Sequence, residues 1–315
     1  QIDKSRFEWI GSDSARREGI SRPSTTFWKD AIGRLMKNKV AVVCFFIIVL
    51  LILSCIIVPF FSPFESREQH LGEVNKGFMT VCTDSRYEGQ HHVHYFGTDN
   101  LGRDLFLRAF EGGRVSLMIA FAAVFVNLIV GLIYGGISGY IGGAVDTIMM
   151  RIVEIVNGIP YLIVVILLMM VLPKGIFTMV VAYGITGWTG MARLVRGQVL
   201  QLKSQEYIVA AEAMGAKSSR IIAKHLIPNA LSVIIINVTL AIPSAIFTEA
   251  FLSYIGLGVP VPQPSWGVLA KGGQDVFMTY PYQLVVPAVA ISLTMLYFNL
   301  LGDGLRDAFD PRLRR

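Results

Sequence analysis

The sequence predicts an all-α polytopic membrane protein with six transmembrane helices. Apolar residues make up 53% of the chain, charged residues only 16%, and the mean hydropathy is +0.57. Soluble domains have about 25% charged residues, so this composition favours a membrane class. Several apolar runs reach the roughly 20 residues that a helix needs to cross a bilayer.

Six segments are predicted as spans. The first, 40–61, contains no charged residue, and it starts too far along the chain and runs too long for a cleavable signal peptide. The other five are 116–138, 148–172, 176–194, 230–255 and 284–301. The segment 176–194 is the weakest, because polar residues and glycines interrupt it near Gly187.

Basic residues predict the orientation. With six spans both chain ends share one side, and that side receives nineteen Lys and Arg, against eight on the other side. Cytoplasmic loops are enriched in Lys and Arg, so both termini and the 195–229 loop are expected in the cytoplasm. The net charge of +6 is then an orientation signal and gives no reason to expect nucleic acid as a partner.

The sequence predicts that the chain is divided into five segments. Residues 1–39 are a cytoplasmic segment in which 25–39 has apolar residues at helical spacing, with basic residues elsewhere on the wheel. Such a basic amphipathic helix suits the inner surface of the lipid bilayer. The others are a first span at 40–61, an extracytoplasmic loop at 62–112, a five-helix core at 113–302 that includes the cytoplasmic loop 195–229, and a cytoplasmic tail at 303–315.

The predicted outer loop contains three close histidines, His91, His92 and His94. Such a group could bind zinc or nickel. Neighbouring histidines on a solvated loop usually bind nothing, however, and no carboxylate or Cys is spaced with them. We therefore expect no metal there, and we expect Cys82 to stand alone in this loop.

The block 96–117 follows these histidines. Gly97 and Gly102 allow backbone angles that other residues resist, and Thr98 with Asp99 can close an Asx-type turn. Its alternating charges are Asp99, Arg103, Asp104 and Arg108. Charges beside a membrane entry are unfavourable unless paired, so we expect structural ion pairs there rather than ligand contacts.

Spans two and three are rich in glycine, which allows helices to approach closely in lipid. Arg151 and Glu154 are three residues apart and can pair on one helix face, as a packing or gating pair rather than a proton relay. Pro160, Pro243 and Pro287 lie in or beside spans and can kink them. Such kinks would serve either packing or a transport pathway.

The loop between spans four and five has the pattern of two helices separated by a glycine. Residues 206–214 contain no Gly or Pro and repeat apolar residues at helical spacing, and Gly215 ends this helix. Ser218 or Ser219 can cap a second helix, which Pro228 ends unless it starts the next span. The small residues at the centre would allow close docking against another protein.

This loop resembles the coupling loop of permeases of binding-protein-dependent ABC importers. That loop has Glu-Ala-Ala, three residues, Gly, nine residues, Ile, one residue and Leu-Pro. Aligned on Gly215, the two Ala positions and the Pro match, but Val209 takes the Glu position, with Glu212 nearby. The resemblance implies that the ATPase-coupling residues are Ala210, Ala211, Glu212, Ala213, Met214, Gly215, Ala216 and Lys217.

A second resemblance covers essentially everything from residue 25 onward. The segment 96–117 is similar to the signature FGTD-x-x-GRD of the oligopeptide/dipeptide/nickel permease group, and FWKDAIGRLMKNKVAVV and LGDGLRDAFDPRLR resemble that group's two chain ends. The signature residues are Gly97, Thr98, Asp99, Gly102, Arg103 and Asp104. The resemblance implies a type I ABC importer permease fold in the bacterial cytoplasmic membrane, as the second of two permease subunits.

The resemblance also implies partners and cargo. A second permease subunit, two ATP-binding subunits and an extracytoplasmic peptide-binding protein are expected, with peptide as the substrate. The chain has no phosphate loop, since 215–218 lacks the Gly-Lys-Ser/Thr ending, and it has no Ser/His/Asp or metal-protease pattern. We therefore expect no catalytic residue, metal or cofactor in this chain, with ATP and Mg bound by partner subunits.

An ion-gradient-driven secondary transporter is the alternative. It would need paired ionisable residues at mid-membrane, whereas the last two spans contain one carboxylate, Glu249, toward the outer end. A membrane-embedded enzyme would need a reactive cluster near the bilayer surface, for which the three histidines are poor candidates. Peptide length, sequence preference, and the choice between peptide and nickel chelate stay open.

Overall fold

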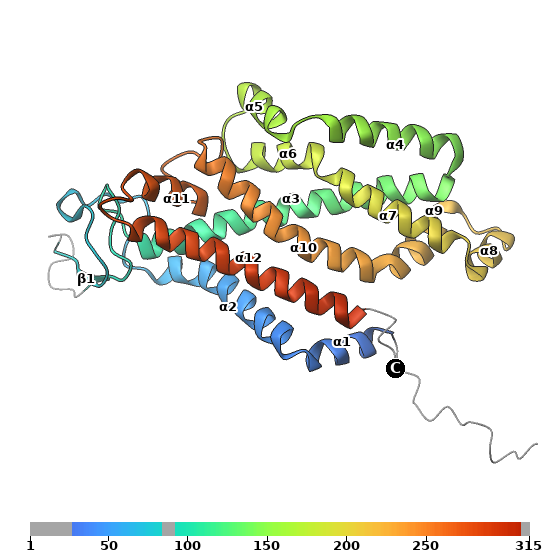
Figure 1. Ribbon diagram of the computed structural model, residues 1–315, viewed down its shortest axis with the longest axis horizontal. Coiled ribbons are helices and arrows are strands. Elements are labelled where there is room, and N and C mark those ends of the chain that lie inside the picture. Colours follow the sequence, from blue (N-terminus) through green and yellow to red (C-terminus); the bar gives the residue numbers. More distant parts are fainter. Residues whose placement is uncertain (1–26, 84–91, 310–315) are drawn as a thin grey trace, which may run out of the picture.

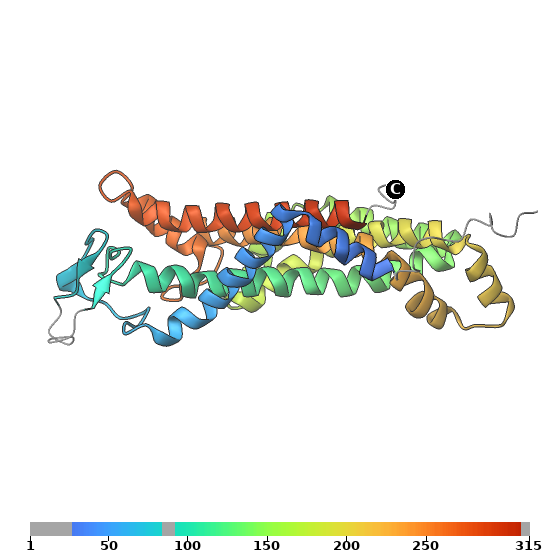
Figure 2. The same ribbon diagram turned by 90° about the horizontal axis from the view of Figure 1, so that it is seen from below.

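The computed structural model of the chain describes residues 27–83 and 92–309. It is an elongated helical bundle whose long helices run between two ends (Figures 1 and 2). One end has the antiparallel strands β1 (Thr80–Val81) and β2 (Val93–His94) with the helix α11 (Trp266–Asp275), and we call it the hairpin end. The other has α8 (Glu206–Ala213), and we call it the α8 end.

Four of the described helices are long and apolar enough to cross a membrane. They are α2 (Lys39–Phe61), α3 (Leu105–Ile141), the continuous helix Ser218–Tyr254, and α12 (Tyr282–Phe309). The helix Ser218–Tyr254 includes α10 (Ile227–Tyr254). All four correspond to predicted spans, although α3 begins well before residue 116.

The predicted spans three and four are each made of two helices. The pair α4 (Gly143–Gly158) and α5 (Tyr161–Val171) is apolar enough to cross together but is bent by 79°. The short apolar helix α6 (Ile176–Thr186) continues through Gly187 into α7 (Trp188–Lys203). These helices are compatible with six spans, and the count of six stays a prediction.

The bend between α4 and α5 occurs at Pro160. Ile159, the residue before it, has an extended backbone with φ −82° and ψ 120°, because a following proline disfavours the helical region. The expected kink at Pro160 is thus confirmed. Pro243 and Pro287 lie inside α10 and α12 and end neither helix.

The predicted amphipathic helix is α1 (Phe27–Lys37). It ends before Asn38, whose Oδ1 accepts a hydrogen bond from the Ala41 amide at 3.2 Å and so caps α2. Ile32 and Met36 are exposed, which leaves an apolar face on α1. Both α1 and the last turn of α12 lie toward the α8 end (Figure 1), and this agrees with the predicted shared side of the termini.

A row of glycines brings α3 against α7. A Cβ on Gly135 would lie 3.0 Å from the Cβ of Val195, and one on Gly139 would lie 3.0 Å from the Cβ of Val199. Arg196 of α7 also makes two hydrogen bonds of 2.5 Å to the carboxylate of Asp146 in α4. The expected close approach through small residues is therefore present, and α4 is fastened to the same pair.

The predicted pair of Arg151 and Glu154 is present, with 2.7 Å between Nη1 and Oε2. Both side chains are more than half exposed on the surface of α4. This exposure argues against a role in packing within the chain.

The helix α11 was missed by the sequence interpretation. Ser265 caps it, with Oγ accepting from the Val268 amide at 3.3 Å. The buried Trp266 donates from Nε1 to the Ala109 carbonyl at 2.9 Å and from its amide to Ser116 Oγ at 3.1 Å. These bonds fasten α11 to α3, and α11 also contacts α10 and α12.

The α3–α7 contact makes a stability prediction. Gly135→Ala should lower the free energy of unfolding by about 1–3 kcal/mol, because the added methyl overpacks the interface. Gly197→Ala is the matched control, since a Cβ on Gly197 meets open space. Thermal unfolding of the full chain in detergent measures both, and equal midpoints for the two variants would contradict this account of the contact.

Candidate functional site

Asp99 organises the turn at the hairpin end. Its Oδ1 accepts from the amides of Leu101 and Arg103 at 2.8 and 3.0 Å, which is the expected Asx turn. Its Oδ2 accepts from Arg103 Nε at 2.7 Å and lies 3.7 Å from Arg108 Nε. The buried Arg108 also donates to the Ser66 carbonyl at 2.7 Å. The expected ion pairs are therefore present.

Gly97 and Gly102 adopt positive φ angles of 75° and 74°. A side chain on Gly97 would run into the carbonyl oxygen of Lys76, and one on Gly102 into that of His70. Both positions therefore require glycine for conformation and for space. The turn can then pack directly on the backbone of the preceding loop.

Thr98 connects this turn to the start of α12. Its hydroxyl donates to the Glu73 carbonyl at 2.5 Å and accepts from the Lys76 amide at 2.8 Å. Its carbonyl accepts from the Tyr282 hydroxyl at 3.1 Å and from Gln283 Nε2 at 3.2 Å. Tyr282 and Gln283 were not predicted as site residues, because nothing in their spacing relates them to a loop 184 or 185 residues away.

Asp104 connects the same turn to α3 and to a buried histidine. Its Oδ1 accepts from the Leu107 amide at 2.6 Å and caps α3, while its Oδ2 lies 2.7 Å from His94 Nδ1. The other ring nitrogen of His94 lies 3.0 Å from Glu73 Oε2. Burial lowers the pKa of His94, but the hydrogen bonds to Asp104 and Glu73 outweigh it and raise that pKa overall.

The expectation that no carboxylate or Cys lies near the histidines is wrong at His94. The fold brings Glu73 to its ring, and Cys82 Sγ lies 3.3 Å from Glu73 Oε2. Burial raises the pKa of Glu73, but hydrogen bonds led by that from the Thr83 amide lower it overall. The pairing of β1 with β2 makes this juxtaposition, and His91 lies outside the described residues.

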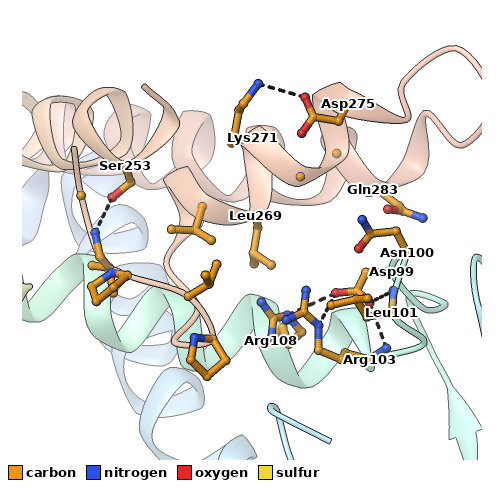
Figure 3. A pocket seen from close by; sticks show the side chains of 18 of the residues that line it. Asp99, Asn100, Leu101, Arg103, Arg108, Ser253, Leu269, Lys271, Asp275 and Gln283 are labelled. Carbon is orange, nitrogen blue, oxygen red and sulfur yellow. Dashed lines mark hydrogen bonds and ion pairs between the residues drawn. The ribbon is translucent and has the colours of Figure 1, made fainter. Parts of the chain in front are cut away.

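A cavity of about 710 Å³ opens beside the turn (Figure 3). Asp99, Arg103 and Arg108 line one side, and Lys271 and Asp275 of α11, paired at 2.9 Å, lie on the other. Ser253 at the end of α10, the segment 258–262 and Gln283 at the start of α12 also line it. The cavity thus offers charges of both signs, amide groups and apolar surface, and its described lining includes neither His nor Cys.

Glu249 lies near the hairpin end, as its position in the sequence indicated. It is buried in α10, and its Oε1 accepts from Ser253 Oγ at 2.7 Å. Glu249 forms no ion pair among the described residues, which is not the paired arrangement that an ion-driven transporter would need.

The helix predicted over 206–214 is α8, and Gly215 ends it. Gly215 has φ 76°, its amide donates to the Glu212 carbonyl at 2.9 Å, and the Ala216 amide donates to the Ala211 carbonyl at 3.1 Å. These two bonds form a Schellman motif. The predicted glycine stop is therefore confirmed.

The second predicted helix differs from expectation at its start. Lys217 takes the N-cap position of α9 (Ser218–Ile221) without a side-chain hydrogen bond, so capping by Ser218 or Ser219 is wrong. At its other end the π-helical turn η5 (Ile222–Leu226) joins it to α10, and Pro228 lies in the first turn of α10. The alternative that Pro228 starts the next span is therefore confirmed. Proline is tolerated in the first helical turn, where its missing N–H has no partner in any case.

Two contacts fasten α8 to the bundle. Ile208 is fully buried in a cluster with Val199 of α7 and Ile221 of α9. Glu212 Oε1 accepts from the Tyr140 hydroxyl at 3.0 Å, and Lys203 Nζ donates to the Tyr140 carbonyl at 2.5 Å. The last turn of α3 thus supports α8.

Most of the residues predicted for ATPase coupling lie on the exposed side of α8 and its turn. Ala211 is buried, whereas Met214 is 81% exposed. The other exposed residues of this set are Ala210, Glu212, Ala213, Gly215 and Lys217, with Ala216 half-buried. The exposed Tyr207 and Val209 extend this surface. The coupling set and the signature set lie at opposite ends of the molecule (Figure 1).

Comparison with known proteins supports the resemblance. Residues 127–315 match the family model of the binding-protein-dependent transport system inner membrane component. Residues 26–77 match the N-terminal TM domain of oligopeptide transport permease C. A chain of the MetNI methionine ABC transporter in an inward facing conformation superposes with a TM-score of 0.52 at 21% identity, covering 65% of this chain and 97% of that chain. The fold is therefore that of a type I ABC importer permease.

Two curated relatives come from Bacillus subtilis (strain 168). The oligopeptide transport system permease protein OppC is 49% identical and covers 100% of this chain and 99% of that protein. The dipeptide transport system permease protein DppC is 48% identical and covers 95% of this chain and 90% of that protein. The chain is thus a multi-pass membrane protein that belongs to the binding-protein-dependent transport system inner membrane component family, as an OppC/DppC-like permease.

Proposed function

We propose that this chain is the permease subunit of an ABC importer that moves peptides into the bacterial cytoplasm. It acts with a second permease subunit, two ATP-binding subunits at the α8 end and a peptide-binding protein at the hairpin end. The chain itself is not an enzyme, and ATP and Mg bind to its partners. The observation that supports this best is α8, a short helix fastened by one buried face with an exposed surface of small and apolar residues.

The ATP-binding subunits act on α8 mechanically. Ile208 fixes α8 to the helix that starts at Ser218 and ends at Tyr254. The far end of that helix, at Ser253, lines the cavity at the hairpin end. A displacement of α8 therefore moves one wall of the cavity, provided that the ATPase pair contacts the two states differently.

Reconstitution tests the proposed function against the alternative. Proteoliposomes with both permease subunits, both ATPase subunits and the binding protein should accumulate a labelled peptide only when ATP is present on the ATPase side. Accumulation driven by an ion gradient without ATP would instead support a secondary transporter. A variant ATPase pair that binds but does not hydrolyse ATP is the control.

The turn after α8 should be essential for coupling. Gly215→Pro should abolish peptide uptake while membrane insertion persists, because proline cannot adopt φ 76°. Gly215→Asn is the matched control and should retain uptake, since asparagine tolerates this conformation. Ala211→Arg should also abolish uptake, by forcing a charge into the buried face of α8, whereas Ala211→Ser should not. Normal uptake by both disruptive variants would refute the coupling role.

The exposed surface of α8 should bind the ATPase subunits. Met214→Glu should reduce their co-purification by roughly tenfold or more, because burying a Met side chain contributes about 1.5–3 kcal/mol. Met278→Glu is the matched control, since Met278 is 96% exposed in the loop between α11 and α12. Equal ATPase recovery with the two variants would argue against docking at α8.

A further inference from the structure

We propose that Glu73, Cys82 and His94 form a structural zinc site that fastens the β1–β2 hairpin to the start of α3. This inference does not depend on the transported substrate. The three side chains come from the 3₁₀ turn η3 (Leu71–Glu73), the residue after β1, and β2. One ligand atom from each lies within 4.8 Å of the others.

The three candidate ligand atoms converge. Glu73 Oε2 lies 3.0 Å from His94 Nε2 and 3.3 Å from Cys82 Sγ. Zinc bonds of 2.0–2.3 Å in a tetrahedron put ligand atoms about 3.4–3.6 Å apart. At these two contacts the cation needs the atoms to separate by only a few tenths of an ångström, and the third pair of ligand atoms lies within 4.8 Å. It would replace the two protons that now bridge Cys82 and His94 to the carboxylate oxygen.

The other polar atoms of the ligands are already held. Glu73 Oε1 accepts from the amide and the hydroxyl of Thr83, which leaves Oε2 facing the cluster. His94 Nδ1 is bonded to Asp104, which leaves Nε2 facing the cluster. Phe64 stacks on the His94 ring with centroids 4.4 Å apart. A carboxylate on the distal nitrogen is the usual support of a zinc-binding histidine.

Burial and charge select the metal. The three residues are 2%, 8% and 0% exposed in chain order. A thiolate and a carboxylate together neutralise a divalent cation, as a buried site requires. A set of S, N and O ligands suits zinc and excludes the hard cation magnesium, which prefers oxygen ligands and retains water. The described residues supply three of the four ligands that zinc usually takes.

Such a metal would join four pieces of the outer structure. Its ligands lie on η3, directly after β1 and on β2, and Asp104 connects His94 to the N-terminus of α3. The main-chain carbonyl of Glu73 also accepts a hydrogen bond from the hydroxyl of Thr98 in the signature turn. The metal would therefore stabilise the turn that lines the cavity, with no part in chemistry.

Metal binding to the purified full chain tests the proposal. After chelator treatment, ZnCl₂ is added back and bound zinc is counted by elemental analysis and by competition with a chromophoric chelator. We expect one zinc per chain, no displacement by excess Mg²⁺, and a higher unfolding temperature with zinc. Substitution with Co²⁺ should give a near-ultraviolet thiolate-to-cobalt band, which reports the Cys82 bond directly.

Variants separate this site from adventitious binding. Cys82→Ser should abolish the cobalt band and the zinc, whereas Cys44→Ser and Cys55→Ser, which alter cysteines of α2, should change neither. Asp104→Asn keeps a capping side chain but should weaken zinc binding by about 10–100-fold through His94. Absence of the cobalt band in the wild-type chain, or zinc binding unchanged by Cys82→Ser, would overturn the proposal and leave a purely hydrogen-bonded cluster.

Discussion

The close contact of α3 with α7 is the constraint on which the rest of the structure depends. In lipid there is little hydrophobic drive between helices, so packing of backbone against backbone supplies much of the association. Gly135 and Gly139 permit that packing, and Arg196 adds α4 to it through Asp146. Because α3 spans 37 residues, its position fixes structures at both ends of the molecule.

The two candidate sites are connected by helices rather than by proximity. Asp104 starts α3 at the hairpin end, and Tyr140 in the last turn of α3 supports α8 through Glu212. The second connection is the helix from Ser218 to Tyr254, which begins beside α8 and ends at the cavity. A rigid shift of the helix Ser218–Tyr254 against α3 would alter the cavity without changing either helix internally.

The sequence predicted the features that depend on local chemistry. Gly215, Pro160 and the Asp99 turn each act through their own backbone or through residues a few positions away, so their effects were foreseeable. The buried group around His94 was not, because Glu73 and His94 are 21 residues apart and only the strand pairing brings them together. The helix α11 was missed for a related reason, since its amphipathic face is explained only by α3, α10 and α12.

The position of Val209 changes how α8 can bind its partner. A family carboxylate is replaced there by an exposed apolar side chain, and the nearby Glu212 accepts a hydrogen bond from Tyr140 of its own chain. Glu212 thus secures α8 to α3 and is less available as a charged contact for another subunit. Docking at α8 should then depend on burial of Tyr207, Val209 and Met214, an interaction that salt screens much less than an ion pair.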